Sequence, residues 1–264
     1  MGSAVLSTAA YASQAKDWQL GLQEPATPLM TQLVSMHDYV LMPIITVITI
    51  FVLALLIYVM FRFNSRSNPT PAKFTHNLPI EIAWTLIPVL ILAVIAVPSF
   101  RLLFKQDVIP EADMTIKATA SSWYWSYEYP DHDDISLTAL LLPEEEARST
   151  GKPWLLATDE NVVVPVGAVV RVQVTSTDVI HSWTVPAFGV KIDAMPGRLN
   201  ETWFQAEREG MFYGQCSELC GKDHAFMPIA VEVVSQEKFD AWVKSQTASN
   251  DLSPKTTDVA LRAK

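Results

Sequence analysis

Residues 39–61, which read YVLMPIITVITIFVLALLIYVMF, decide the architecture of this chain. They form a run of 23 residues without a charge, bounded by Asp38 and Arg62. A helix rises by about 1.5 Å per residue, so a run of this length can cross a hydrocarbon core of about 30 Å. The stretch therefore predicts a transmembrane helix.

A second apolar stretch covers residues 82–100 and holds 19 residues without a charge. Pro88 and Pro98 lie inside it, and membrane helices tolerate proline because the freed carbonyls find partners locally. Two such runs are not typical of a helical hairpin buried in a soluble protein. We therefore expect residues 37–106 to form a transmembrane hairpin.

The residues between the two runs indicate the orientation of the hairpin. Arg62, Arg66 and Lys73 lie there without an acidic residue among them. Short loops rich in lysine and arginine stay on the cytoplasmic side of a membrane. Both termini of the chain are then expected outside the cytoplasm.

Residues 1–36 are expected to form an extracytoplasmic segment in front of the hairpin. The first 13 residues are rich in alanine and contain Ala10-Tyr11-Ala12, which resembles a small-residue cleavage site. The basic residues that begin an export signal are missing. The stretch is therefore either the remnant of an export signal or a disordered start.

The charge of the chain is unevenly distributed. Residues 1–106 carry 6 Lys and Arg against 4 Asp and Glu, whereas residues 107–264 carry 13 against 24. Nucleic acids require basic surfaces, so the acidic part argues against a nucleic-acid partner. It suits a basic protein partner, although acidity also serves solubility alone.

The region that follows the hairpin, residues 107–245, has the pattern of an all-β domain. Short alternating or β-branched segments are separated by prolines and glycines, which predicts a β-sandwich or barrel. The clearest predicted strands are residues 114–119, 161–164, 168–175 and 229–234. Residues 143–160 are expected to form a polar excursion with one helical turn, residues 236–245 a short helix, and residues 246–264 a disordered tail.

A cysteine motif lies near the end of this domain, where residues 214–228 read GQCSELCGKDHAFMP. The spacing of Cys216 and Cys220 fits a structural disulfide as well as a metal site. His224 and Met227 follow within the same loop. Two thiolates, an imidazole and a thioether form the soft ligand set that selects copper, whereas zinc rarely takes a thioether.

One further ligand is expected from another strand, and His181 is the candidate. By itself, a histidine next to Trp183 is more often a buried core residue than a ligand. Its combination with the cysteine loop favours the metal role. A mononuclear blue-copper site needs one thiolate, so the second cysteine suggests thiolates that bridge two coppers.

These motifs resemble subunit II of the haem–copper cytochrome c oxidases. The resemblance runs from about residue 25 to residue 243. Its specific motifs are FTHN at residues 74–77, IEIAWT at 80–85, WYWSYEY at 123–129, DVIHSW at 178–183, PGR at 196–198, and the CxxxCxxxHxxM loop. It implies a two-helix membrane hairpin followed by a cupredoxin-like β-barrel that holds a dinuclear copper A centre.

The resemblance also implies a role for each ligand. Cys216 and Cys220 would bridge the two coppers, His181 and His224 would each bind one, and Met227 would be an axial ligand. The backbone carbonyl of Glu218 would be the other axial ligand, and its side chain would bind magnesium at the junction with the catalytic subunit.

Further residues receive roles from the same resemblance. Trp123 would be the point of electron entry; because strands alternate, we expect it to share a face with Trp125. Glu81 would open a proton path, although a carboxylate in a first helical turn also stabilises the helix dipole. The acidic docking face for cytochrome c would comprise Glu128, Asp134, Asp159 and Asp178, with Asp131 and Asp133 as further candidates.

The implied function is an electron relay from cytochrome c to the haem-bearing subunit I, where oxygen is reduced to water and protons are pumped. Subunit III and membrane lipid would be further partners. The expected location is a bacterial inner membrane, with the copper domain in the periplasm. A membrane-tethered copper carrier and a copper-free quinol oxidase subunit are the alternatives.

Overall fold

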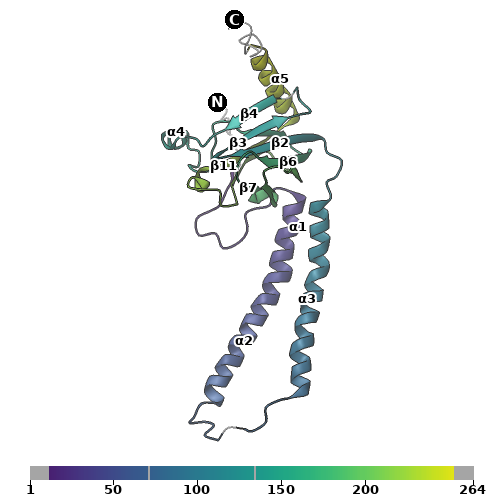
Figure 1. The fold of residues 1–264 in the computed structure, drawn as a ribbon, viewed down its shortest axis with the longest axis vertical. Coiled ribbons are helices and arrows are strands. Elements are labelled where there is room, and N and C mark those ends of the chain that lie inside the picture. The colour runs from purple at the N-terminus through teal and green to yellow at the C-terminus, as the bar shows by residue number, and fades with distance from the viewer. Residues whose placement is uncertain (1–11, 71, 134, 253–264) are drawn as a thin grey trace, which may run out of the picture. The chain divides into compact units, whose positions relative to one another are not determined.

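The computed structural model describes residues 12–252, apart from residues 71 and 134 (Figure 1). It divides into two compact units. Gln32–Lys105 form one of them, and the residues before and after this range form the other.

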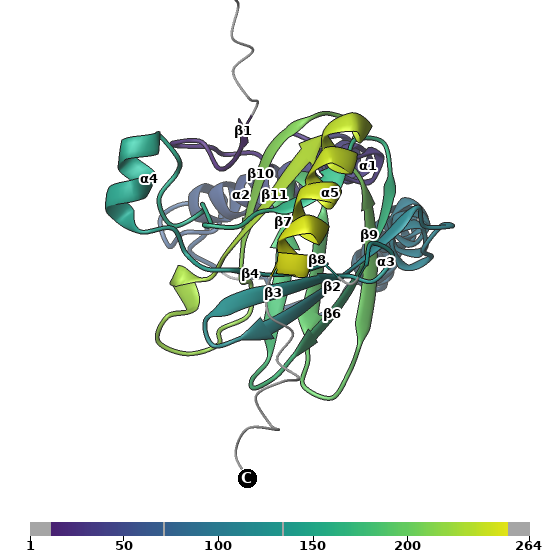
Figure 2. The same ribbon diagram turned by 90° about the horizontal axis from the view of Figure 1, so that it is seen from above.

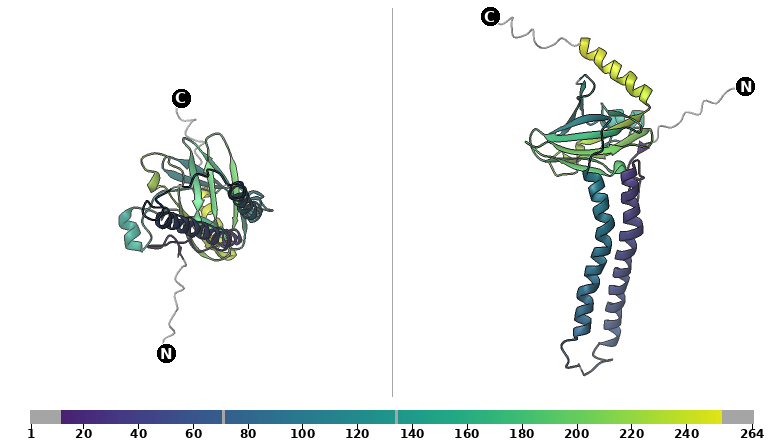
Figure 3. Two further views of the ribbon diagram at one scale, coloured as in Figure 1. Left: turned by 90° about the horizontal axis from the view of Figure 1, so that it is seen from below. Right: turned by 90° about the vertical axis from the view of Figure 1, so that its right-hand side faces the viewer.

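Two long helices make up the first unit. Helix α1 (Pro28–Met36) continues through a π-helical turn (His37–Leu41) into α2 (Met42–Arg62). Helix α3 covers Leu78–Asp107. Both long helices have the length and apolar composition that a membrane span requires. Figure 3 shows them side by side, joined by residues 63–77, as the sequence predicts.

Helix α1 begins at Pro28, within the segment expected in front of the hairpin. Thr27 caps it, since its Oγ1 accepts a hydrogen bond of 3.0 Å from the Met30 amide. Pro28 follows at the first helical position, where its missing amide costs nothing. The same Thr27 hydroxyl donates to the Phe188 carbonyl at 2.8 Å, so this helix end is fixed to the β domain.

The second unit is a β-sandwich built from two main sheets (Figure 2). One sheet has the strand order β4-β3-β2-β6-β9, the other β1-β10-β11-β5, and β7 pairs with β8. The first sheet comprises β2 (Met114–Ser121), β3 (Tyr124–Tyr129), β4 (Ile135–Ala139), β6 (Val169–Ser176) and β9 (Asn200–Gln205). The second comprises β1 (Ala12–Ser13), β5 (Val162–Pro165), β10 (Gly210–Gln215) and β11 (Pro228–Val234), and the pair is β7 (His181–Val185) and β8 (Val190–Ala194).

The core between these sheets follows from the alternation of side chains along the strands. In β2 and β3, buried residues alternate with half-buried ones, as expected for strands with one face inward. Phe188 and Phe204 stack at 4.5 Å between ring centroids inside the core. The four predicted strands and the predicted fold class, a membrane hairpin followed by a cupredoxin-like barrel, are confirmed.

The segment in front of the hairpin joins the sandwich as a strap, which we define as residues 12–31. Its strand β1 lies parallel to β10, with Ala12 opposite Met211. Further along, the Ala26 amide donates to the Ala187 carbonyl at 2.9 Å, and the Ala26 carbonyl accepts from the Glu207 amide at 2.9 Å. The strap therefore completes the edge of one sheet.

Two short helices complete the β domain. Helix α4 (Glu144–Thr150) is the helical turn expected in the polar excursion. Helix α5 (Gln236–Leu252) continues beyond Ser245, so the tail predicted to be disordered from residue 246 begins too early. Phe239 and Trp242 anchor α5, because the Trp242 ring lies 5.0 Å from that of Tyr129.

Candidate metal centre

The cysteine loop connects β10 to β11, and its two ends are held together by backbone pairing. Gln215 lies opposite Pro228 in the antiparallel ladder, and the Cys216 amide donates to the Met227 carbonyl at 2.9 Å. The intervening residues form a closed loop at the ends of these two strands. His181 is the first residue of β7, and the Ser217 amide donates to the Ser182 carbonyl at 3.1 Å. The loop and the histidine are thus brought together by the sandwich.

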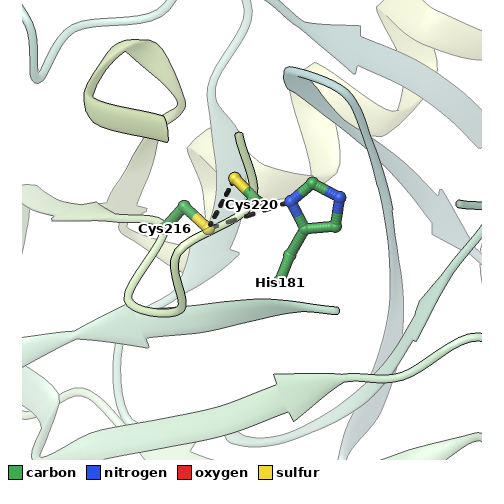
Figure 4. A group of neighbouring side chains, drawn as sticks. All are labelled: His181, Cys216 and Cys220. Carbon is green, nitrogen blue, oxygen red and sulfur yellow. Dashed lines mark hydrogen bonds between the residues drawn. The ribbon is translucent and has the colours of Figure 1, made fainter. Parts of the chain in front are cut away.

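The side chains of His181, Cys216 and Cys220 point toward one another (Figure 4). The Cys216 sulfur lies 3.9 Å from His181 Nδ1 and 3.8 Å from the Cys220 sulfur. Both cysteines are free thiols, since a disulfide requires about 2.05 Å between sulfurs. Of the two readings of the cysteine spacing, the structure therefore favours a metal site.

His224 lies next to Cys220 and adds a second imidazole to this cluster. It begins the short 3-10 turn His224–Phe226, and its Nδ1 lies 3.5 Å from the Cys220 sulfur. The Glu218 carbonyl oxygen lies 3.4 Å from the Cys216 sulfur. Met227 is fully buried at the end of the loop. The structure therefore brings together both cysteines, both histidines and the Glu218 carbonyl, while ligation by the Met227 thioether stays a prediction.

The chemistry of this pocket suits a metal cation better than an empty thiol pair. His181, Cys216 and Cys220 are all buried. Burial and the neighbouring Cys216 raise the pKa of Cys220 to about 12. A bound cation would offset the cost of two adjacent thiolates in a water-poor site. Two thiolates and two imidazoles are donors that copper accepts well, so the residues present fit a copper centre.

Asp178 holds His181 in the orientation that a ligand needs. One carboxylate oxygen lies 2.9 Å from His181 Nε2, and the amides of Ser122 and Val179 each donate to the carboxylate at 2.7 Å. Burial opposes the charge of Asp178, but these hydrogen bonds outweigh it and lower its pKa well below the usual value. Because a carboxylate only accepts, Nε2 carries the proton and Nδ1 is free to bind a metal.

Trp123 touches the ligand loop directly. Its indole Nε1 donates a hydrogen bond of 3.1 Å to the Cys220 carbonyl. Its ring covers Gly221, where an added Cβ would lie 2.9 Å from Trp123 Cζ2. The expectation that Trp123 shares a strand face with Trp125 is wrong, because β3 begins only at Tyr124 and the chain turns at Trp123. Trp125 is fully buried, and Trp123 is half-buried at the loop.

The acidic residues predicted to form a docking face have local partners. The carboxylate of Glu128 pairs with Lys117 at 3.0 Å, and that of Asp159 accepts from the Leu140 amide at 2.7 Å. Asp131 accepts from the Thr115 amide at 2.7 Å, and Asp133 is exposed. Asp134 lies outside the described residues.

The sequence analysis did not predict that Asp178 orients His181. The sequence indicates this role only through the spacing, because Asp178 precedes His181 by three residues.

Glu81 lies in the first turn of α3 and acts there as part of the helix cap. Its Oε1 accepts a hydrogen bond of 3.0 Å from the Asn77 amide. This contact supports the interpretation of Glu81 as a group that stabilises the helix start. This does not test the proton-path role.

Comparison with known proteins agrees with this site. The sequence matches the cytochrome c oxidase subunit II transmembrane domain over residues 15–102 and the periplasmic domain of the same subunit over residues 114–234. It is 50% identical over 257 residues to a probable cytochrome c oxidase subunit 2 of Rickettsia bellii, which covers 97% of this chain and 95% of that protein.

Two further relatives have the same character. The cytochrome c oxidase subunit 2 of Cereibacter sphaeroides is 51% identical over 241 residues, 85% of this chain and 79% of that protein. The crystal structure of the periplasmic domain of subunit II (CoxB) of Bradyrhizobium japonicum has a TM-score of 0.50 at 56% identity, covering 54% of this chain and 99% of that one. This chain therefore belongs to the cytochrome c oxidase subunit II family and is a subunit of a haem–copper oxidoreductase.

Proposed function

We propose that this chain receives electrons from cytochrome c at a dinuclear copper centre and passes them to the haem-bearing subunit I of the oxidase. The observation that carries the proposal is the cluster of two thiols and two imidazoles, in which neighbouring donor atoms lie 3.5–3.9 Å apart. Oxygen reduction and proton pumping then occur in the partner subunit. The redox role of this chain is electron transfer.

Residues of the cysteine loop would hold the metal together with His181 of β7. The thiolates of Cys216 and Cys220, the imidazoles of His181 and His224, the Glu218 carbonyl and the Met227 thioether would together hold the coppers. A copper pair held in this way supplies a one-electron carrier whose charge is spread over both metals and their sulfurs. The buried walls exclude water, and Asp178 fixes the His181 ring.

Electron entry at Trp123 is supported by its contact with the loop. The indole is half-buried, and its Nε1 is hydrogen-bonded to the carbonyl of Cys220. The path for an electron from the indole to the Cys220 sulfur would therefore consist of this hydrogen bond and the covalent bonds of Cys220. Glu128, Asp134, Asp159 and Asp178 would guide the basic face of cytochrome c, which agrees with the acidic balance of the chain.

We also propose the orientation in the membrane. The basic residues Arg62, Arg66 and Lys73 favour a cytoplasmic loop. The pairing of β1 with β10 supports one common side for the segments before and after the hairpin. Both termini and the metal domain would then lie in the periplasm of a bacterial inner membrane. Subunit III, magnesium at the Glu218 side chain and a proton path at Glu81 complete the proposal.

Metal analysis combined with electron paramagnetic resonance on the purified complex tests the copper assignment. We expect two coppers in this chain sharing one unpaired electron in the oxidised state. A Cys220→Ser variant, which keeps a single thiolate, should lose the shared signal. One copper with a localised signal in the wild-type chain would contradict the dinuclear assignment.

A further inference from the structure

A cleft of about 420 Å³ lies within the helical unit, between the residues that lead into α2 and the last turns of α3. Gln32, Ser35 and Tyr39 contribute polar groups from the first helix. Arg101 and Lys105 contribute two cations from α3. Residues 32, 35 and 39 share one helix face, and residues 101 and 105 are one turn apart, so the two faces confront each other.

The cleft is positively charged without internal compensation. No acidic residue lines it. Among the described residues, no ion pair includes Arg101 or Lys105, while nearby Asp38 is paired with His37 at 2.7 Å. Two unpaired cations one turn apart favour an anionic ligand, since the guanidinium and the ammonium both bind phosphate well.

The position of the cleft along the helices identifies the kind of anion. The uncharged run of the first helix begins at Tyr39, and that of the second ends at residue 100, directly before Arg101. Val40 and Pro98 line the cleft one step further into these apolar runs. Its polar part thus lies where a bilayer places its headgroups, and its apolar part lies where the acyl chains begin.

We propose that this cleft binds one anionic phospholipid of the leaflet on the side of the metal domain. Arg101 and Lys105 bind the phosphate, Ser35 and Tyr39 donate hydrogen bonds to its oxygens, and an acyl chain runs past Val40 and Pro98. A zwitterionic lipid also offers a phosphate, but its own cation would leave the net positive charge of the cleft unchanged, whereas an anionic lipid lowers it. The gradient from polar to apolar lining matches an amphiphile better than a soluble anion.

The test uses the assembled oxidase in nanodiscs that contain phosphatidylglycerol and phosphatidylcholine. Native mass spectrometry counts the phosphatidylglycerol molecules retained during detergent exchange. We expect Arg101→Gln with Lys105→Gln to weaken retention of one molecule by about ten- to thirtyfold. Arg66→Gln with Lys73→Gln removes the same charge from the opposite end of the hairpin and should leave that molecule bound.

Two further arms keep the proposal falsifiable. Val40→Trp fills the apolar part of the cleft without changing its charge and should also release the lipid. This variant tests the proposal if the double variant fails to assemble. Glycerol phosphate, which lacks acyl chains, should not compete. Equal retention in the double variant, competition by glycerol phosphate, or loss of a neighbouring subunit with lipid retention unchanged would each overturn the proposal. Copper content, measured in parallel, reports separately on the metal domain.

Discussion

Asp178 is the residue whose role the structure changes most. Its carboxylate contacts His181 and two backbone amides, so removing it frees the imidazole and leaves the Ser122 and Val179 amides unpaired. We expect Asp178→Ala to weaken copper binding by about 10- to 100-fold. Electron uptake should slow with cytochrome c and also with a small inorganic reductant such as hexaammineruthenium(II), measured by stopped-flow absorbance.

Glu128→Gln provides the matched control for Asp178. Glu128 is paired with Lys117 on the surface and has no contact with a ligand among the described residues. This variant should slow the reaction with cytochrome c alone, and the effect should shrink at high salt. If Asp178→Ala behaved in the same way as Glu128→Gln, the orienting role of Asp178 would be wrong.

At Trp123, the contribution of the hydrogen bond to electron entry can be tested separately from that of the aromatic ring. Trp123→Phe keeps an aromatic side chain over Gly221 but loses the donor to the Cys220 carbonyl. We expect copper content to stay unchanged and electron uptake from cytochrome c to slow by about tenfold, which corresponds to about 1.4 kcal/mol in the barrier. A normal rate would refute entry through this contact.

Residue types and spacing predicted the ligand set, but they could not predict how its members are oriented. The soft donors of the loop were visible because they lie within a few residues of one another in the chain. The contact of Trp123 with Cys220 joins residues 97 positions apart. Such a contact depends on the turn before β3 and the path of the loop, which local patterns do not encode.

At the scale of elements, β10 and β7 lie close together where Gly214 faces the backbone of Thr184. A Cβ added to Gly214 would overlap the backbone of Thr184, because it would collide with the carbonyl oxygen and lie only 2.9 Å from the carbonyl carbon. We expect Gly214→Ala to push the strand of His181 away and to lower the free energy of unfolding by about 1–3 kcal/mol. Denaturant titration checks this. Gly21→Ala, with nothing within 4 Å, should have little effect.

At the start of α3, a substitution of Glu81 can distinguish a structural role of this residue from a role in proton transfer. Glu81→Gln keeps a side-chain oxygen for the Asn77 amide but cannot exchange a proton at neutral pH. We expect helix stability to fall by no more than about 1 kcal/mol, because only the charge–dipole interaction is lost, with slower haem reduction in the assembled enzyme and normal copper reduction. Slow copper reduction with normal haem reduction would contradict the proton-path role.

The elements themselves were largely predictable, and the exceptions have physical reasons. Uncharged runs revealed both spans, because membrane helices must be apolar throughout. The helices extend past these runs, from Pro28 to Arg62 and from Leu78 to Asp107, since polar turns at the ends can remain helical in water. Helix α5 outlasts its prediction because Phe239 and Trp242 anchor a helix whose sequence alone is only weakly helical.

For the whole molecule, two buried tyrosines predict alkaline sensitivity. Burial raises the pKa of Tyr127 and of Tyr129 above the usual value. Above about pH 10 the unfolded chain releases these protons while the folded chain retains them, so stability falls as pH rises. We expect a loss of about 1.4 kcal/mol per pH unit for each tyrosine. Denaturant midpoints measured from about pH 9 to about pH 11 should fall less steeply with pH in Tyr127→Phe than in the wild-type protein.

The strap has a consequence for how the protein is made. Its residues leave the ribosome before the hairpin, yet they complete a sheet whose other strands, β5, β10 and β11, leave it after the hairpin. In the proposed orientation, β1 crosses the membrane early and stays unpaired until the hairpin has been inserted and β10 has followed. If only one of the two spans were inserted, β1 and β10 would lie on opposite sides of the membrane, and the sheet would lack its edge strand. The β domain with the metal site can therefore be completed only after the hairpin has been inserted correctly.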